Sequence, residues 1–224
     1  MRHGYLLSTL LLVAATAHAG VIINGTRLVY QGDKKESSLG LSNPDATDYL
    51  VQSWVDSGGK NLAKAPFLIT PPLFRLDAKE DNVLRVVRTG GNLPEDRESL
   101  YWLNIKAIPS SKHVEGKNTL QIAINTRIKL LYRPSSVKGK PEEAADKLEW
   151  HREGNDLVVN NPTPFYMNFQ KVTLNGHKVD KATWAVPRTE THFALPGNVS
   201  GSTVAYSIIA DYGSISQTWS KSVH

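Results

Sequence analysis

The segment Thr119–Pro134, TLQIAINTRIKLLYRP, decides the fold of this chain. Apart from Thr126, every second side chain in it is apolar: Leu120, Ile122, Ile124, Ile128, Leu130 and Tyr132. A period of two places these side chains on one face of an extended chain. At roughly 3.3 Å per residue the apolar run is about 40 Å long, whereas most strands measure about 17–20 Å. We therefore predict one long β-strand, which is either a sandwich core strand or a strand that extends beyond its own sheet.

Composition limits the class of protein. A chain of 224 residues suffices for one large domain or two of about 100 residues each. It contains no cysteine, which excludes disulfides, thiolate catalysis and cysteine-based metal sites. The net charge of +5 is not gathered into a run of like charges, so we predict no nucleic-acid partner.

The N-terminus has the pattern of an export signal. A short basic region, Met1-Arg2-His3, precedes an apolar core at Leu6–Ala17 and an A-x-A cleavage site at Ala17-His18-Ala19. No second apolar stretch is long enough for a membrane span, so we predict no integral membrane segment. Export without cysteines is typical of a bacterial periplasm. We therefore predict a signal peptide at residues 1–19 and a periplasmic protein.

After the signal, short β-like segments alternate with turns, and no helical period is sustained. This pattern predicts an all-β fold with two sandwich domains. Residues 138–146 are polar and rich in proline, glycine and charge, as linkers are, so we place the domains at residues 20–137 and 147–224. Within the linker, Glu142–Lys147 could form one helical turn, but it offers no apolar side chain to anchor it. The predicted strands are Thr26–Gln31, Ser38–Ser42, Tyr49–Val55, Phe67–Thr70, Asn82–Arg88, Leu100–Lys106, Thr119–Arg133, Leu148–Arg152, Asp156–Asn160, Phe165–Asn175, His192–Leu195, Thr203–Asp211 and Ser214–Ser220.

Catalytic patterns are weak. The segment Asp56-Ser57-Gly58-Gly59 is similar to the nucleophile region of chymotrypsin-like proteases, but the only upstream histidines, His3 and His18, belong to the signal peptide. The remaining histidines form no metal-binding pair, and there is no phosphate-binding or dinucleotide motif. We therefore predict a protein that is not an enzyme, with no cofactor and no metal.

The segment Leu93–Ser110, LPEDRESLYWLNIKAIPS, resembles the signature of periplasmic pilus chaperones of the chaperone–usher pathway. Three further segments, TRLVY from Thr26, TPPLFR from Thr70 and IADYG from Ile209, resemble the same family in the same order. The resemblance implies two immunoglobulin-like domains in a boomerang-like arrangement. It also implies a chaperone that binds, folds and caps pilus subunits, both pilins and the tip adhesin, and delivers them to an outer-membrane usher.

The resemblance implies three groups of site residues. Leu120, Ile122 and Ile124 would be donated to a subunit that lacks its last strand. Arg27 and Lys129 would bind the C-terminal carboxylate of the subunit. Glu98, Arg133 and Asp211 match the family's interdomain ionic network, which contributes only about 1 kcal/mol per pair if it is partly exposed. An ideal strand points Lys129 to the face opposite the donated side chains, and a strand twist or a bulge could reconcile the two roles.

The loop Ser110–Asn118 has nine residues, and a short loop here is similar to that of the branch which assembles rod-like pili. An exposed apolar strand could also be capped by self-dimerisation. Two alternatives remain: an exported immunoglobulin-like pilus subunit, which would have one domain without its final strand, and a carbohydrate-binding module or hydrolase, which would need an aromatic platform or a carboxylate pair.

Overall fold

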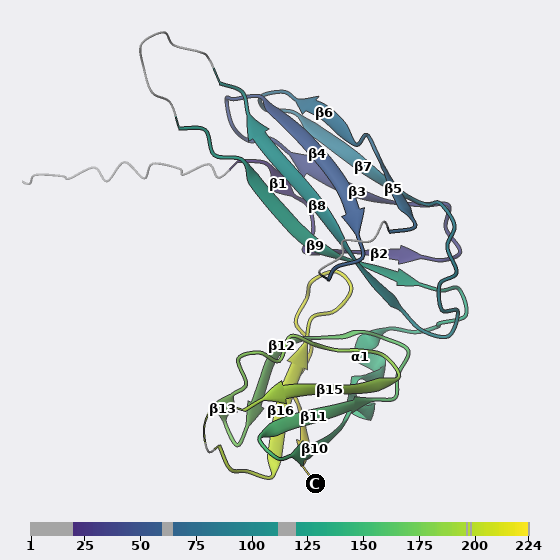
Figure 1. Cartoon of the computed structure of the whole chain (residues 1–224), viewed down its shortest axis with the longest axis vertical. Helices are drawn as coiled ribbons and strands as arrows, with labels where there is room; N and C mark the ends of the chain where they lie inside the picture. Colours follow the sequence, from purple (N-terminus) through teal and green to yellow (C-terminus); the bar gives the residue numbers. More distant parts are fainter. Residues whose placement is uncertain (1–19, 60–64, 112–119, 196, 198, 224) are drawn as a thin grey trace, which may run out of the picture.

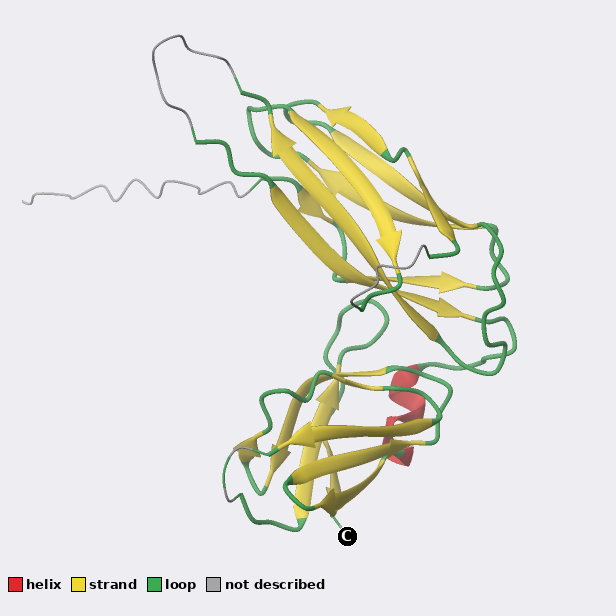
Figure 2. Ribbon diagram, in the orientation of Figure 1, coloured by secondary structure: helices red, strands yellow, loops and turns green. Residues whose placement is uncertain are grey.

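The protein consists of two β-sandwiches that are bent at their junction (Figures 1 and 2). The computed structural model describes residues 20–59, 65–111, 120–195, 197 and 199–223. The predicted all-β class with two immunoglobulin-like domains is confirmed. The predicted signal peptide and most of the loop Ser110–Asn118 lie outside the described residues. Among the residues that are described, no helix is long and apolar enough to cross a membrane.

The first sandwich packs a four-stranded sheet, β1-β3-β7-β5, on a five-stranded sheet, β2-β9-β8-β4-β6. Its strands are β1 (Ile22–Ile23), β2 (Arg27–Gln31), β3 (Glu36–Ser42), β4 (Tyr49–Asp56), β5 (Phe67–Thr70), β6 (Leu73–Leu76), β7 (Asp81–Arg88), β8 (Ser99–Pro109) and β9 (Ile124–Arg133). Alternating side chains such as Leu39, Leu41 and Val51 fill the space between the sheets. The chain changes sheets between β1 and β2, because β1 pairs with β3 whereas β2 pairs with β9.

The second sandwich packs the sheet β10-β11-β15 on the sheet β13-β12-β16-β17, with β14 paired to β12. Its strands are β10 (Glu149–Glu153), β11 (Asp156–Asn161), β12 (Met167–Leu174), β13 (His177–Lys178), β14 (Trp184–Ala185), β15 (Thr189–Ala194), β16 (Thr203–Ile208) and β17 (Trp219–Ser222). The strands predicted at Thr203–Asp211 and Ser214–Ser220 are wrong in part, because residues 209–218 form a loop. This loop lies at the junction of the two domains, in yellow in Figure 1.

The segment before β10 corrects the expectation that nothing would anchor a helical turn there. It forms α1 (Pro141–Ala144) and a 3-10 turn, η1 (Ala145–Lys147). Pro141, Ala144 and Ala145 are buried, and the hydroxyl of Tyr206 donates to the carbonyl oxygen of Ala145 at 2.7 Å. The alanines are small enough to pack on the second domain's core, so large apolar residues are not needed.

Strand β9 begins five residues later than the strand predicted from Thr119. It pairs antiparallel with β8 over Ile124–Tyr132, and parallel with β2 over Lys129–Arg133 only. The same antiparallel register would place Ile122 opposite Pro109, which has no N–H to donate to a ladder. In the described part of the chain, Ile124–Ile128 therefore has a strand neighbour on one side only, and Leu120–Ala123 has none.

Candidate functional site

The apolar face of the organising segment is divided into a buried half and an exposed half. Ile128, Leu130 and Tyr132 lie in the core of the first domain and are at most 7% exposed. Leu120, Ile122 and Ile124 are 88%, 65% and 52% exposed. The two interpretations of the long strand thus apply to different halves: its C-terminal half is a core strand, and its N-terminal half carries three large apolar side chains outside any core.

The exposed half borders the open end of the first sandwich. A cavity of about 230 Å³ lies between Ile122 and Ile124 on one side and Val21, Ile23 and Tyr49 on the other. The backbone edge of β9 beside it offers N–H and C=O groups to a further strand, as unpaired edges do. This end of the domain therefore combines an apolar surface with a free hydrogen-bonding edge.

Arg27 and Lys129 are direct partners in the parallel pairing of β2 with β9. Their neighbours Leu28 and Leu130 point into the first domain's core, so the two cations leave the opposite face of the sheet. The pairing of β9 shows no register shift with either neighbour. No bulge lies between Ile124 and Lys129 in β9, so these two side chains leave opposite faces of the strand, and a bulge does not reconcile the two roles.

Neither cation has a counterion among the described residues. Arg27 Nη1 donates to the carbonyl oxygen of Ile209 at 3.1 Å, and its Nε is buried without a hydrogen-bond partner. Lys129 Nζ donates to Asn168 Oδ1 and lies 4.3 Å from the centre of the Trp184 ring. Burial lowers the pKa of Arg27 although Asp211 and Glu98 oppose this, and burial together with Arg27 lowers the pKa of Lys129 to about 8. An anion placed between the two cations would supply the counterion that both lack.

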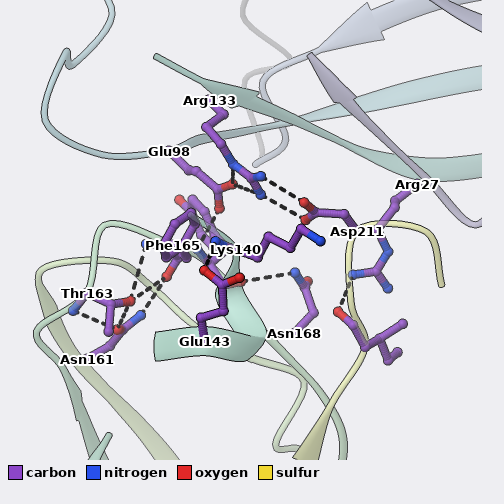
Figure 3. A network of polar contacts seen from close by, with 12 residues as sticks. Arg27, Glu98, Arg133, Lys140, Glu143, Asn161, Thr163, Phe165, Asn168 and Asp211 are labelled. Atoms are coloured by element: carbon purple, nitrogen blue, oxygen red, sulfur yellow. Dashed lines mark hydrogen bonds and ion pairs between the residues drawn. The ribbon is translucent and has the colours of Figure 1, made fainter. Parts of the chain in front are cut away.

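Glu98, Arg133 and Asp211 form a buried ionic network between the domains (Figure 3). Arg133 at the end of β9 donates through Nε to Glu98 Oε1 at 2.8 Å, and through Nη1 and Nη2 to the two carboxylate oxygens of Asp211 at 2.7 and 2.8 Å. Glu98 Oε2 also accepts the N–H of Tyr166 in the second domain at 2.7 Å. One arginine thus links a carboxylate from each domain.

The network is far more buried than the partly exposed set considered from the sequence. The side chains of Arg133, Glu98 and Asp211 are 4%, 1% and 14% exposed. Burial raises the pKa of Glu98 against the opposing effect of Arg133. For Arg133, burial lowers the pKa, but hydrogen bonding to Asp211 and attraction by Glu98 outweigh it and raise the net value. The figure of about 1 kcal/mol per pair assumed partial exposure and does not apply here. Removal of one partner of a buried pair costs about 3–5 kcal/mol, because the other charge is left uncompensated.

Sequence reasoning missed the second domain's share of the site. Asn168 on β12 and Trp184 on β14 contact Lys129, and the Ile209 carbonyl contacts Arg27. It also missed a cluster beside them, in which Arg127 pairs with Asp56 at 2.7 Å and stacks over Trp102 at 4.5 Å. Only the alternation of Arg127 with Lys129 on one strand face could have indicated this cluster; no motif marks Asn168 or Trp184.

Two family models match nearly the whole described chain. The model "Pili and flagellar-assembly chaperone, PapD N-terminal domain" matches residues 20–138, and the model "Pili assembly chaperone PapD, C-terminal domain" matches residues 143–220. The chain belongs to the pilus-assembly chaperone family. The predicted resemblance is confirmed, and neither a pilus subunit nor a carbohydrate-binding module is supported.

Individual relatives agree with the family models. The chaperone is 44% identical to the chaperone protein LpfB of Salmonella typhimurium over 209 residues, which are 91% of this chain and 90% of LpfB. A chain of the solved complex of Salmonella enterica SafA pilin with the SafB chaperone matches with a TM-score of 0.84 and 39% identity. The match covers 93% of this chain and 98% of that chain. The E. coli chaperone DraB matches with a TM-score of 0.82 and 39% identity, over 92% and 97% of the two chains. This protein is therefore a pilus-assembly chaperone.

The described residues contain no group of three histidine, cysteine, aspartate or glutamate side chains that could hold a metal ion. Asp56, which the sequence placed in a protease-like segment, accepts hydrogen bonds from Arg127, Asn104 and the N–H of Gly58. The carboxylate of Asp56 thus organises the turn after β4. The relatives named above are chaperones.

Proposed function

We propose that this chaperone acts in the periplasm, binds pilus subunits by donating Leu120, Ile122 and Ile124, and passes the complex to an outer-membrane usher. The observation that carries the proposal is the row of exposed apolar side chains beside the open edge of β9. A subunit that lacks one strand has a complementary defect, an apolar groove with an unpaired edge. Strand addition repairs both at once, as it does in chaperone–pilin complexes generally.

Burial of the three side chains gives the complex most of its binding free energy. Each contributes about 1.5–3 kcal/mol if it is fully covered. Pairing of Ile124–Ile128 with a strand of the subunit satisfies backbone groups that water now solvates. The tip adhesin and the pilins would bind in the same way, since the backbone edge does not distinguish among side chains.

Arg27 and Lys129 supply the register of the complex. A C-terminal carboxylate placed between them would neutralise two half-buried cations and give Arg27 Nε an acceptor. Charge-assisted hydrogen bonds of this kind are roughly twice as strong as neutral ones. The strand of a subunit is thereby fixed at its end, so the apolar side chains meet their pockets in a single register.

The network of Glu98, Arg133 and Asp211 holds the angle between the domains. The loop that contains Asp211 also supplies the Ile209 carbonyl to Arg27. The domain angle and the position of Arg27 are therefore linked through one loop of the second domain.

Co-expression with a pilin of its own pilus system tests the proposal. We expect a one-to-one complex that is released from the periplasm by osmotic shock. A chaperone that never copurifies with a pilin, or that stays in the cytoplasm, would contradict it. Light scattering of the free chaperone then shows whether the exposed half of the strand is capped by a second copy, which we propose for the subunit-free state.

A further inference from the structure

Lys129 is held by two side chains of the second domain. Its ammonium group donates to Asn168 Oδ1 and lies over the ring of Trp184. Asn168 on β12 and Trp184 on β14 are direct partners in the pairing of these two strands. The second domain thus presents an acceptor and an aromatic face side by side to one cation of the first domain.

Both residues are fixed in place. Asn168 is 3% exposed, and its Nδ2 donates to the carbonyl oxygen of Tyr166 at 3.3 Å. The backbone carbonyl oxygen of Asn168 accepts the N–H of Ile209 at 2.7 Å. The Trp184 ring packs edge-on against Trp102 of the first domain, with 6.2 Å between the ring centres. Ile209 in turn accepts the hydrogen bond from Arg27. The backbone of one residue, Ile209, therefore connects Asn168 with Arg27.

Among the described residues, no carboxylate is paired with Lys129. A cavity of about 420 Å³ lies between Lys129, Trp184 and the strands of the second domain. The charged groups around it are Lys171, Lys178 and Asp180, besides Arg27 on the neighbouring strand. Asp180 is paired with Lys178 at 2.9 Å. Among the described residues, the neutral amide oxygen of Asn168 is thus the only oxygen that accepts a hydrogen bond from Lys129.

We propose that Asn168 and Trp184 are positioning residues for the subunit anchor. In the free chaperone the amide oxygen of Asn168 occupies the acceptor position that the subunit carboxylate takes over, and Trp184 keeps the ammonium group in place during the exchange. The exchange is favourable because a carboxylate is a stronger acceptor for an ammonium group than an amide is. This inference rests on the proposed anchor, and it makes the anchor depend on contacts from both domains.

The first test uses the free chaperone, so it does not depend on any subunit. Lysines are reductively methylated with ¹³C and followed by NMR between pH 6 and 11, with Lys129→Arg identifying the signal. We expect the Lys129 signal to be displaced by the Trp184 ring current, to keep this displacement in Trp184→Phe and to lose it in Trp184→Leu. In Asn168→Asp the pKa of Lys129 should rise by a unit or more, whereas Asn168→Ala should not raise it. A Lys129 signal that is the same in all four variants would overturn the inference.

The second test measures binding of a synthetic peptide with alternating apolar residues, as the free acid and as the C-terminal amide. Wild type should prefer the acid. Asn168→Asp introduces an internal carboxylate that competes for Lys129, so its preference for the acid should fall at least tenfold below that of Asn168→Ala. Equal preference in these two variants would overturn the exchange. Equal binding of acid and amide by wild type would contradict the proposed anchor instead, while the NMR result still decides whether Asn168 and Trp184 hold Lys129. Melting temperatures establish that each variant is folded.

Discussion

Arg27 and Lys129, 102 positions apart in the chain, are adjacent in the parallel pairing of β2 with β9 and project from the same face of the sheet. Two like charges at neighbouring positions repel each other, and partial burial increases the cost. The fold tolerates this cost because the cations are held by neutral acceptors, the Ile209 carbonyl and the Asn168 amide. An arrangement that is costly in the free protein and relieved by an anion is typical of a binding site.

Removal of either cation should weaken subunit binding and leave the fold intact. Arg27→Ala or Lys129→Ala deletes one charge-assisted contact to the subunit carboxylate, which is worth about 1.5–3 kcal/mol, or roughly 10- to 100-fold in affinity. Titration with a purified pilin measures the affinity, and thermal melting reports the fold. Lys35→Ala is the matched control, because Lys35 is an exposed cation in the turn between β2 and β3. A folded Arg27→Ala variant with wild-type affinity would remove Arg27 from the anchor.

The lowered pKa of Lys129 makes both stability and binding depend on pH. Between about pH 8 and the unfolded value near 10.5, the unfolded chain binds more protons than the native one, so stability rises with pH in this window. Lys129→Met should therefore stabilise the free chaperone below pH 8 by an amount on the order of 2 kcal/mol, and the gain should disappear above about pH 10.5. Denaturant titrations at several pH values measure this difference.

Subunit affinity, unlike stability, should fall as the pH rises above about 8. A bound carboxylate raises the pKa of Lys129, so binding takes up a proton above pH 8 and weakens as the pH rises further. Lys129→Arg retains its charge throughout this range and should bind with an affinity that does not fall. A wild-type affinity that is constant between pH 7 and 10 would show that Lys129 does not face the bound anion.

The interdomain network should dominate the stability of the pair of domains. Arg133→Ala leaves Glu98 and Asp211 without their cation, and breaking a buried pair of this kind costs about 3–5 kcal/mol. Chemical denaturation measures the loss, and small-angle scattering shows whether the domain angle has changed. The triple variant Arg133→Met, Glu98→Gln, Asp211→Asn removes all three charges and should be more stable than Arg133→Ala. If Arg133→Ala retained wild-type stability and the same scattering envelope, the network would have no role in orientation.

The sequence was sufficient for the features that depend on alternation and on family motifs. It predicted the two sandwiches and the organising strand, whereas the roles of the three groups of site residues stay predictions. It did not predict β1, β6, β13 or β14, because segments of two to four residues carry too little periodicity. It could not predict that only half of the apolar face is buried, since burial depends on where β2 and β8 end. The contacts of Lys129 with Asn168 and Trp184 depend on the packing of two domains, which no local pattern encodes.

The divided face of the organising segment gives the sharpest prediction. Ile122→Asp places a carboxylate on an exposed position, so the melting temperature of the free chaperone should change little. Ile128→Asp, on the same face six residues later, buries a carboxylate without a partner in the first domain's core, which costs several kcal/mol and should unfold the protein.

Affinity for a pilin should distinguish Ile122→Asp from Gln121→Asp. In the complex the side chain at position 122 enters the dry groove of the subunit, so Ile122→Asp should weaken pilin binding by more than 100-fold at an unchanged melting temperature. Gln121→Asp is the control on the opposite face and should retain most of its affinity, since its side chain points away from the groove. A collapsed melting curve for Ile122→Asp would mean that the exposed half also belongs to the chaperone's own core. Equal affinities of Ile122→Asp and Gln121→Asp would mean that position 122 is not donated.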